Sequence, residues 1–127
     1  MIAAIFSNNH RNFLGLRHGI QIFGGQYAAI MAEENKAIIL PTLQHPSRHQ
    51  TIVDFTAEKY ANNSDNISSD SAVDYSIAYI YHLCKVNELL APILLIQHNM
   101  DQMENFIILL RTIKDSPEQL TATLELV

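Results

Sequence analysis

The amino-acid sequence predicts an α/β fold: a small, mostly parallel sheet of about four strands, with helices on both faces and the last strand at an edge. Three observations lead to this prediction. Short, continuously apolar and isoleucine-rich segments are typical of strands that are covered on both faces. Segments with apolar residues at helical spacing lie between them, and the C-terminal segment alternates apolar with polar residues, as an edge strand does. The chain of 127 residues has the length of one domain, residues 1–127.

The predicted strands fall into two types. Three are buried, at residues 2–6, 37–40 and 93–96, because each is an unbroken apolar run that contains isoleucine. The last, at residues 120–127, has leucine or alanine at alternate positions with threonine or glutamate between them. That alternation predicts one buried and one solvated face.

The first helix is predicted over residues 13–32, where apolar residues recur at spacings of three and four. Gly24 and Gly25 weaken this prediction, since glycine destabilises a helix by up to ~1 kcal/mol relative to alanine. The alternative is a β-hairpin with the two glycines as its turn, which would make the fold α+β with an N-terminal hairpin. We favour the helix because residues 28–34 are good helix formers.

Three further helices and one loop are predicted after the second strand. The second helix covers residues 47–60, since a serine and a glutamine three positions later form a capping box at its start. Residues 62–70 are polar and predict a mobile surface loop. The third and fourth helices cover residues 71–90 and 99–113, and each begins at a residue suited to capping.

The composition excludes several classes of protein. Hydrophobic residues make up 48% of the chain and charged residues 17%, which excludes a disordered chain or a coiled coil. The single cysteine, Cys84, cannot form an internal disulfide or a thiolate zinc cluster. The longest apolar run, residues 89–96, is too short to span a membrane as a helix. We therefore expect a cytoplasmic protein without a bound metal or cofactor.

The net charge of −5 is unevenly distributed along the chain. Residues 1–50 hold four basic and two acidic residues, whereas residues 51–127 hold four basic and eleven acidic residues. A uniformly basic surface is missing, which argues against nucleic acid as a partner. A local anion site in the first fifty residues remains compatible with this distribution.

The candidate site follows from the predicted parallel sheet, because ligands bind beyond the carboxyl ends of parallel strands. Basic residues at helix starts oppose the helix dipole, and a bound anion would reverse that cost. The segments after the first three predicted strands contain such residues. We therefore predict an anion-binding rim in which His10 and His98 are catalytic groups for proton transfer or nucleophilic attack. The predicted ligand-binding residues are Asn8, Asn9, Arg11, His45, Arg48 and His49.

Two functions fit these features, and the sequence leaves open whether the protein is an enzyme. The first is binding of an anionic metabolite or nucleotide at the rim, with or without histidine chemistry. The alternative is a non-catalytic regulatory or assembly subunit that acts through protein contacts. The acidic second part, a helix face with Tyr75 and Tyr79, and the edge strand at residues 120–127 favour the alternative. These features predict a homo-oligomer or a protein partner.

Overall fold

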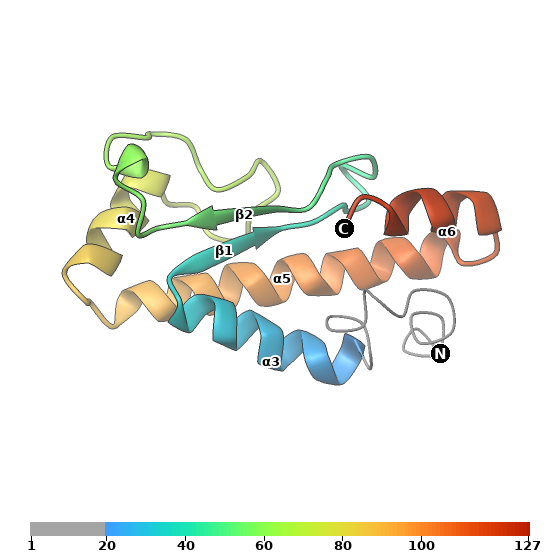
Figure 1. Cartoon of the computed structure of the whole chain (residues 1–127), viewed down its shortest axis with the longest axis horizontal. Helices are drawn as coiled ribbons and strands as arrows, with labels where there is room; N and C mark the ends of the chain where they lie inside the picture. The colour runs from blue at the N-terminus through green and yellow to red at the C-terminus, as the bar shows by residue number, and fades with distance from the viewer. Residues whose placement is uncertain (1–19) are drawn as a thin grey trace.

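The computed structural model describes residues 20–127. This part of the chain forms an α+β fold with four α-helices, one short 3-10 helix and a two-stranded sheet (Figure 1). None of these helices combines enough length with enough hydropathy to traverse a lipid bilayer. In chain order the elements are α3 (Ile20–Glu33), β1 (Lys36–Ile39), β2 (Thr51–Asp54), η2 (Glu58–Tyr60), α4 (Ile77–Lys85), α5 (Leu90–Ile113) and α6 (Pro117–Leu124).

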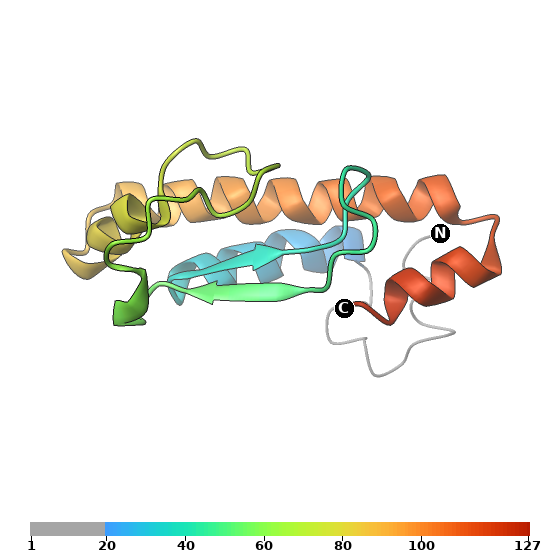
Figure 2. The same ribbon diagram turned by 90° about the horizontal axis from the view of Figure 1, so that it is seen from above.

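The long helix α5 organises the molecule. α3 and β1 pack along it, α4 lies near its N-terminal end, and α6 folds back beside its C-terminal end (Figure 1 and Figure 2). The apolar core has two parts. One part surrounds the first half of α5 and includes Phe55, Ile80 and Leu95. The other surrounds the second half and includes Ile38 and Phe106, so α5 contributes to both.

The sheet consists of β1 and β2 in antiparallel register, with Ala37 opposite Val53. β1 is buried on both faces, because Ala37 and Ile39 contribute to one part of the core and Ile38 contributes to the other. β2 is buried on one face only, since Val53 is covered and the side chain of Ile52 is 40% exposed. The unbroken apolar sequence of β1 reflects this double burial.

Two asparagines with positive φ angles end the helices that precede β1 and α5. Asn35 has a φ of 60° and Asn87 a φ of 57°, a region that asparagine enters more readily than most residues. After α4, the Asn87 N–H donates to Cys84 O at 3.2 Å and the Glu88 N–H donates to Leu83 O at 3.0 Å. This hydrogen-bond pair is a Schellman motif, which satisfies the last carbonyls of α4 and turns the chain into α5.

The predicted fold class is wrong. The described residues contain one antiparallel pair of strands and no four-stranded parallel sheet, so the alternative α+β class fits better. The hairpin is formed by residues 36–54, however, and Gly24 and Gly25 lie inside helix α3 and not in a turn between strands; residues 13–19 of the predicted segment lie outside the described residues. The predicted strand at residues 2–6 lies outside the described residues.

Individual elements show where sequence patterns were ambiguous. The predictions for residues 37–40 and 99–113 are confirmed by β1 and the second part of α5, and α4 occupies the middle of the helix predicted over 71–90. Residues 93–96 lie inside α5, because an apolar run of four residues has the same appearance in a buried helix as in a strand. Two further predictions are wrong. Residues 47–60 contain β2 and η2 in place of a helix, and most of the predicted strand at 120–127 belongs to α6.

Helix α6 has a clear start signal that the alternating pattern concealed. The hydroxyl of Ser116 at the N-cap accepts a hydrogen bond from the Gln119 N–H at 3.4 Å, and Pro117 occupies the first turn. Serine followed by proline favours a helix start, because proline lacks the N–H that would be unpaired there. Leu124 then packs in the second part of the core, as a helical residue.

Candidate functional site

Three polar side chains of α5 lie in the protein interior. His98, Asn99 and Gln102 are all 0% exposed. His98 and Asn99 lie four and three positions before Gln102, so each lies beside Gln102 on one side of the helix, because positions three and four apart are neighbours on a helix surface. Buried polar groups need hydrogen-bond partners, and here the partners come largely from β1 and the loop that follows it.

The amide side chains of α5 close the edge of β1 that faces away from β2. The Ile38 N–H donates to Asn99 Oδ1 at 2.9 Å, and the Leu40 N–H donates to Gln102 Oε1 at 3.0 Å. Asn99 Nδ2 in turn donates to Lys36 O at 3.0 Å. Residues 36, 38 and 40 offer these groups because alternate residues of an antiparallel strand point away from the partner strand. The helix thus replaces a third strand.

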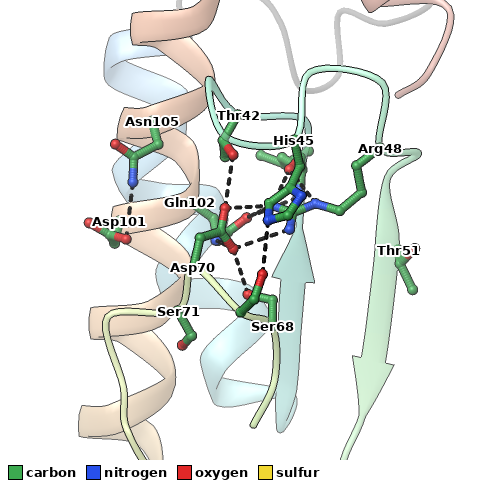
Figure 3. A network of polar contacts seen from close by, with 12 residues as sticks. Thr42, His45, Arg48, Thr51, Ser68, Asp70, Ser71, Asp101, Gln102 and Asn105 are labelled. Carbon is green, nitrogen blue, oxygen red and sulfur yellow. Dashed lines mark hydrogen bonds and ion pairs between the residues drawn. The ribbon is translucent and has the colours of Figure 1, made fainter.

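Asp70 is the centre of a second group of contacts, drawn in Figure 3. Arg48 binds it through two nitrogens, with Nη1 at 3.1 Å from Oδ1 and Nη2 at 2.9 Å from Oδ2. Thr42 Oγ1, Ser68 Oγ and Gln102 Nε2 also donate to the carboxylate, at 2.8, 2.7 and 3.2 Å. Five donors therefore occupy the two oxygens, and the carboxylate has little capacity left for a ligand.

Arg48 also joins this network to Leu40, the residue that follows β1. Its Nε and Nη2 donate to Leu40 O at 3.0 and 2.6 Å, and Nη2 is 3.2 Å from Gln102 Oε1. The guanidinium charge is matched by Asp70, whose side chain is only 6% exposed. The contacts of Arg48 therefore hold the loop after β1 and the segment before α4 against α5.

The charge state of Asp70 follows from its surroundings. Burial acts to raise its pKa, but the hydrogen bonds from Arg48, Ser68 and Thr42 and the charge of Arg48 outweigh burial. The pKa of Asp70 is consequently held far below the ordinary aspartate value, and the carboxylate remains ionised at neutral pH.

His98 is fully committed to internal hydrogen bonds. Its Nε2 lies 2.8 Å from Ile38 O, and its Nδ1 lies 2.7 Å from Ser71 Oγ. A carbonyl can only accept, so Nε2 carries the proton and Nδ1 accepts from the Ser71 hydroxyl. Ser71 Oγ also accepts from the Val73 N–H at 3.1 Å, which fixes the hydroxyl. Burial lowers the pKa of His98, so the ring is neutral.

The structure brings together some of the residues that the sequence singled out. Arg48 and His98 both bind carbonyls of the β1 segment, and His45 Nε2 lies 2.8 Å from Ser69 Oγ beside them. His49 is exposed. The predicted site residues Asn8, Asn9, His10 and Arg11 lie outside the described residues.

Three members of the network were missed from the sequence: Asp70, Asn99 and Gln102. Asp70 stands in a polar segment that looked like a surface loop, and no local pattern connects it to Arg48. Asn99 and Gln102 have the spacing of a capping pair at the start of the helix predicted over 99–113, but both lie within α5. Both stand among the apolar positions of a helical pattern. Polar residues at such positions must find hydrogen-bond partners in the interior, and this placement is the feature of the sequence that indicates their role.

A polar hollow of about 320 Å³ adjoins the network and is lined in part by Thr42, Asp70, Ser71 and Asn105. Asn105 Nδ2 donates to Asp101 Oδ2 at 3.1 Å. Among residues 20–127, no group of three or more histidine, cysteine, aspartate or glutamate side chains is placed to hold a metal ion. The polar side chains of the network form hydrogen bonds that join α5, the β1 segment and residues 68–71.

Acid is expected to destabilise the protein through His98. Its pKa in the folded state lies below the ordinary value of 6.5, so the unfolded chain binds more protons as the pH falls below that value. The stability contributed by neutral His98 is complete above pH 6.5 and is lost as the pH falls through the folded pKa. Urea unfolding at about pH 7.5 and about pH 5 measures this loss.

The His98→Gln variant is the control for this expectation. It lacks the titrating ring, so its free energy of unfolding should change less between the two pH values than that of the natural chain. An equal change in both proteins would contradict the assignment. Asp70 adds a separate loss at lower pH, below its ordinary pKa of 3.8, because its folded pKa is also lowered.

Comparison with known proteins places this chain in a family. Residues 11–116 match the model of the family described as queuine tRNA-ribosyltransferase. Similar proteins include the queuine tRNA-ribosyltransferase accessory subunit 2 of Caenorhabditis elegans, 31% identical over 109 residues, which are 83% of this chain and 29% of that protein. The protein of the same name from Drosophila grimshawi is 33% identical over 118 residues, 87% of this chain and 28% of that protein. The chain spans less than a third of the length of these curated relatives.

These matches overturn two predictions. The main functional prediction, an anion-binding protein for a small metabolite with histidine chemistry, is wrong, because the relatives are named as accessory subunits of a tRNA ribosyltransferase. The predictions of partners are also wrong where they argued against nucleic acid and for a homo-oligomer. The alternative of a regulatory or assembly subunit agrees better with these names.

Proposed function

Since the chain belongs to the queuine tRNA-ribosyltransferase family, we propose that it acts as part of an accessory subunit of a tRNA-modifying enzyme. In this role it performs no chemistry itself. It binds a catalytic ribosyltransferase subunit and supports the action of that subunit on tRNA. The similarity to accessory subunits over more than four fifths of the chain is the observation that carries the proposal.

The polar network supports a structural role for the residues that looked catalytic. His98 is 0% exposed and has both ring nitrogens in hydrogen bonds within the chain. Arg48 and Asp70 form an ion pair, so each charge is neutralised by the other. A general base or an anion clamp needs a free atom that faces the substrate, and these groups use theirs to hold α5 against the sheet. We infer that their function is to maintain the fold.

Reconstitution with a catalytic ribosyltransferase subunit tests the proposal. The chain alone is expected to transfer no labelled queuine into tRNA, whereas the catalytic subunit mixed with the chain should transfer it faster than the catalytic subunit alone. Filter-bound radioactivity in tRNA measures both rates, and the two proteins should co-elute in gel filtration. An unrelated protein at the same concentration is the control for nonspecific stabilisation.

Two results would overturn this function. Transfer of queuine by the chain alone would make it a catalytic protein. A chain that neither co-elutes with the catalytic subunit nor changes its rate would have no accessory role.

A further inference from the structure

Large apolar side chains are exposed along α4, the turn after it and the first turn of α5. Among them, Leu89 is 75% exposed and Val86 is 65% exposed. Figure 1 shows α4 and this turn at one end of the molecule. We call this region the α4–α5 surface, and its members are Tyr75, Tyr79, Val86, Leu89, Leu90 and Ile93.

Hydrogen bonds and ring stacking fix the local structure of the α4–α5 surface. The hydroxyl of Ser76 caps α4 by accepting from the Tyr79 N–H at 3.1 Å. The rings of Tyr75 and Tyr79 stack with their centroids 4.9 Å apart, so two large aromatic side chains form one exposed unit. The opposite face of α4 is buried, with Ile77 and Ile80 in the core. The exposed tyrosines are therefore not needed to pack α4.

The exposed apolar area is large for a chain of this size. The six side chains expose between 37% and 75% of their surfaces. With an area on the order of 200 Å² for a large side chain, they present on the order of 600 Å² together. A standard protein interface buries about 800 Å² on each partner. The α4–α5 surface thus supplies the apolar centre that such an interface needs.

We propose that the α4–α5 surface is the contact through which this chain binds the catalytic ribosyltransferase subunit. This inference rests on the proposed function, which supplies the partner. Tyrosine and aliphatic residues without many charges are typical of the buried centre of protein interfaces.

The local charge favours a protein over tRNA at this surface. Between residues 74 and 93, Lys85 is the single lysine or arginine, and Asp74 and Glu88 are acidic. Lys85 also lies over the ring of Tyr81, 5.8 Å from its centroid. Binding of a phosphate backbone relies on several neutralising lysines and arginines. Contacts of tRNA with the complex are expected elsewhere.

Two single substitutions test the surface in the full chain. Leu89→Asp and Tyr79→Asp place a charge in the interface and should weaken binding to the catalytic subunit by about tenfold or more. Leu43→Asp is the matched control, since Leu43 is 51% exposed in the loop after β1, away from α4. Isothermal titration with the purified catalytic subunit gives the three affinities, and thermal unfolding verifies that each variant folds. Leu89→Asp should fold well, because an acid at a helix start is favourable.

The possible results separate this inference from the proposed function. Weak binding by both α4–α5 variants together with normal binding by Leu43→Asp supports the α4–α5 surface as the contact with the catalytic subunit. Normal binding by all variants would show that the α4–α5 surface is not the contact, and it would leave the accessory role intact. Failure of the natural chain to bind the catalytic subunit would overturn the accessory role itself. Self-association of the natural chain that Leu89→Asp abolishes would overturn the inference in favour of a second copy. Loss of tRNA binding alone would overturn it in favour of RNA.

Discussion

Replacement of Asp70 by alanine is expected to lower the free energy of unfolding at neutral pH by about 3 kcal/mol. The substitution leaves Arg48 without its counter-ion and removes the acceptor for Thr42, Ser68 and Gln102. Removal of one partner from a buried ion pair costs about 3–5 kcal/mol, and the lower end applies because Arg48 is 20% exposed. Urea unfolding monitored by circular dichroism measures the difference.

Asp54→Ala is the matched control for that experiment. Asp54 accepts from the N–H and the hydroxyl of Thr56 at 3.0 and 2.7 Å, but it lies at the protein surface. Water can replace those bonds, so the loss should stay below about 1 kcal/mol. Equal losses for the two variants would show that the Asp70 network is no stronger than a surface turn.

Replacement of Asn99 by leucine is expected to cost about 3 kcal/mol in the free energy of unfolding. Leucine has the same branching and the same number of side-chain heavy atoms, but it cannot accept from the Ile38 N–H or donate to Lys36 O and Ala28 O. Each buried group left without a partner costs about 1–3 kcal/mol, and these are backbone groups that cannot move away. Hydrogen exchange of the Ile38 amide should accelerate in parallel with the loss of stability.

Asn105→Leu provides the comparison within the same helix. Asn105 is half-buried, and its side chain donates to Asp101 at 3.1 Å. Its replacement should cost less than about 1 kcal/mol, because the carboxylate can turn to water. If Asn99→Leu is no more harmful than Asn105→Leu, α5 does not act as the third strand of the sheet.

The sequence predicts an element correctly where all of its residues are buried or where its apolar residues recur at a regular spacing. β1 is apolar throughout because it is covered on both faces, and that pattern identifies it. Residues 99–113 have the spacing of a helix and form one. Residues 93–96 were misassigned because four apolar residues carry no period. Residues 47–60 contain a strand because β2 pairs with β1, a contact between segments that the local sequence does not encode.

The structure places two of the predicted site residues on the same hairpin edge, although no parallel sheet brings them there. Arg48 and His98 were expected to meet at the carboxyl ends of parallel strands. In the structure both bind carbonyls on one edge of an antiparallel hairpin. His98 binds Ile38 O, and Arg48 binds Leu40 O. Both side chains form hydrogen bonds with other parts of the chain in this arrangement.

The sequence by itself determined the strand β1, the helical character of most of α5 and the helix face that carries Tyr79. The tertiary structure alone decided what the polar residues do. Asp70 and Arg48 are 22 positions apart, and Asn99 and Ile38 are 61 positions apart. Side chains so distant along the chain meet only after α5 has packed on β1, because burial removes water and leaves each polar group no partner other than another part of the protein.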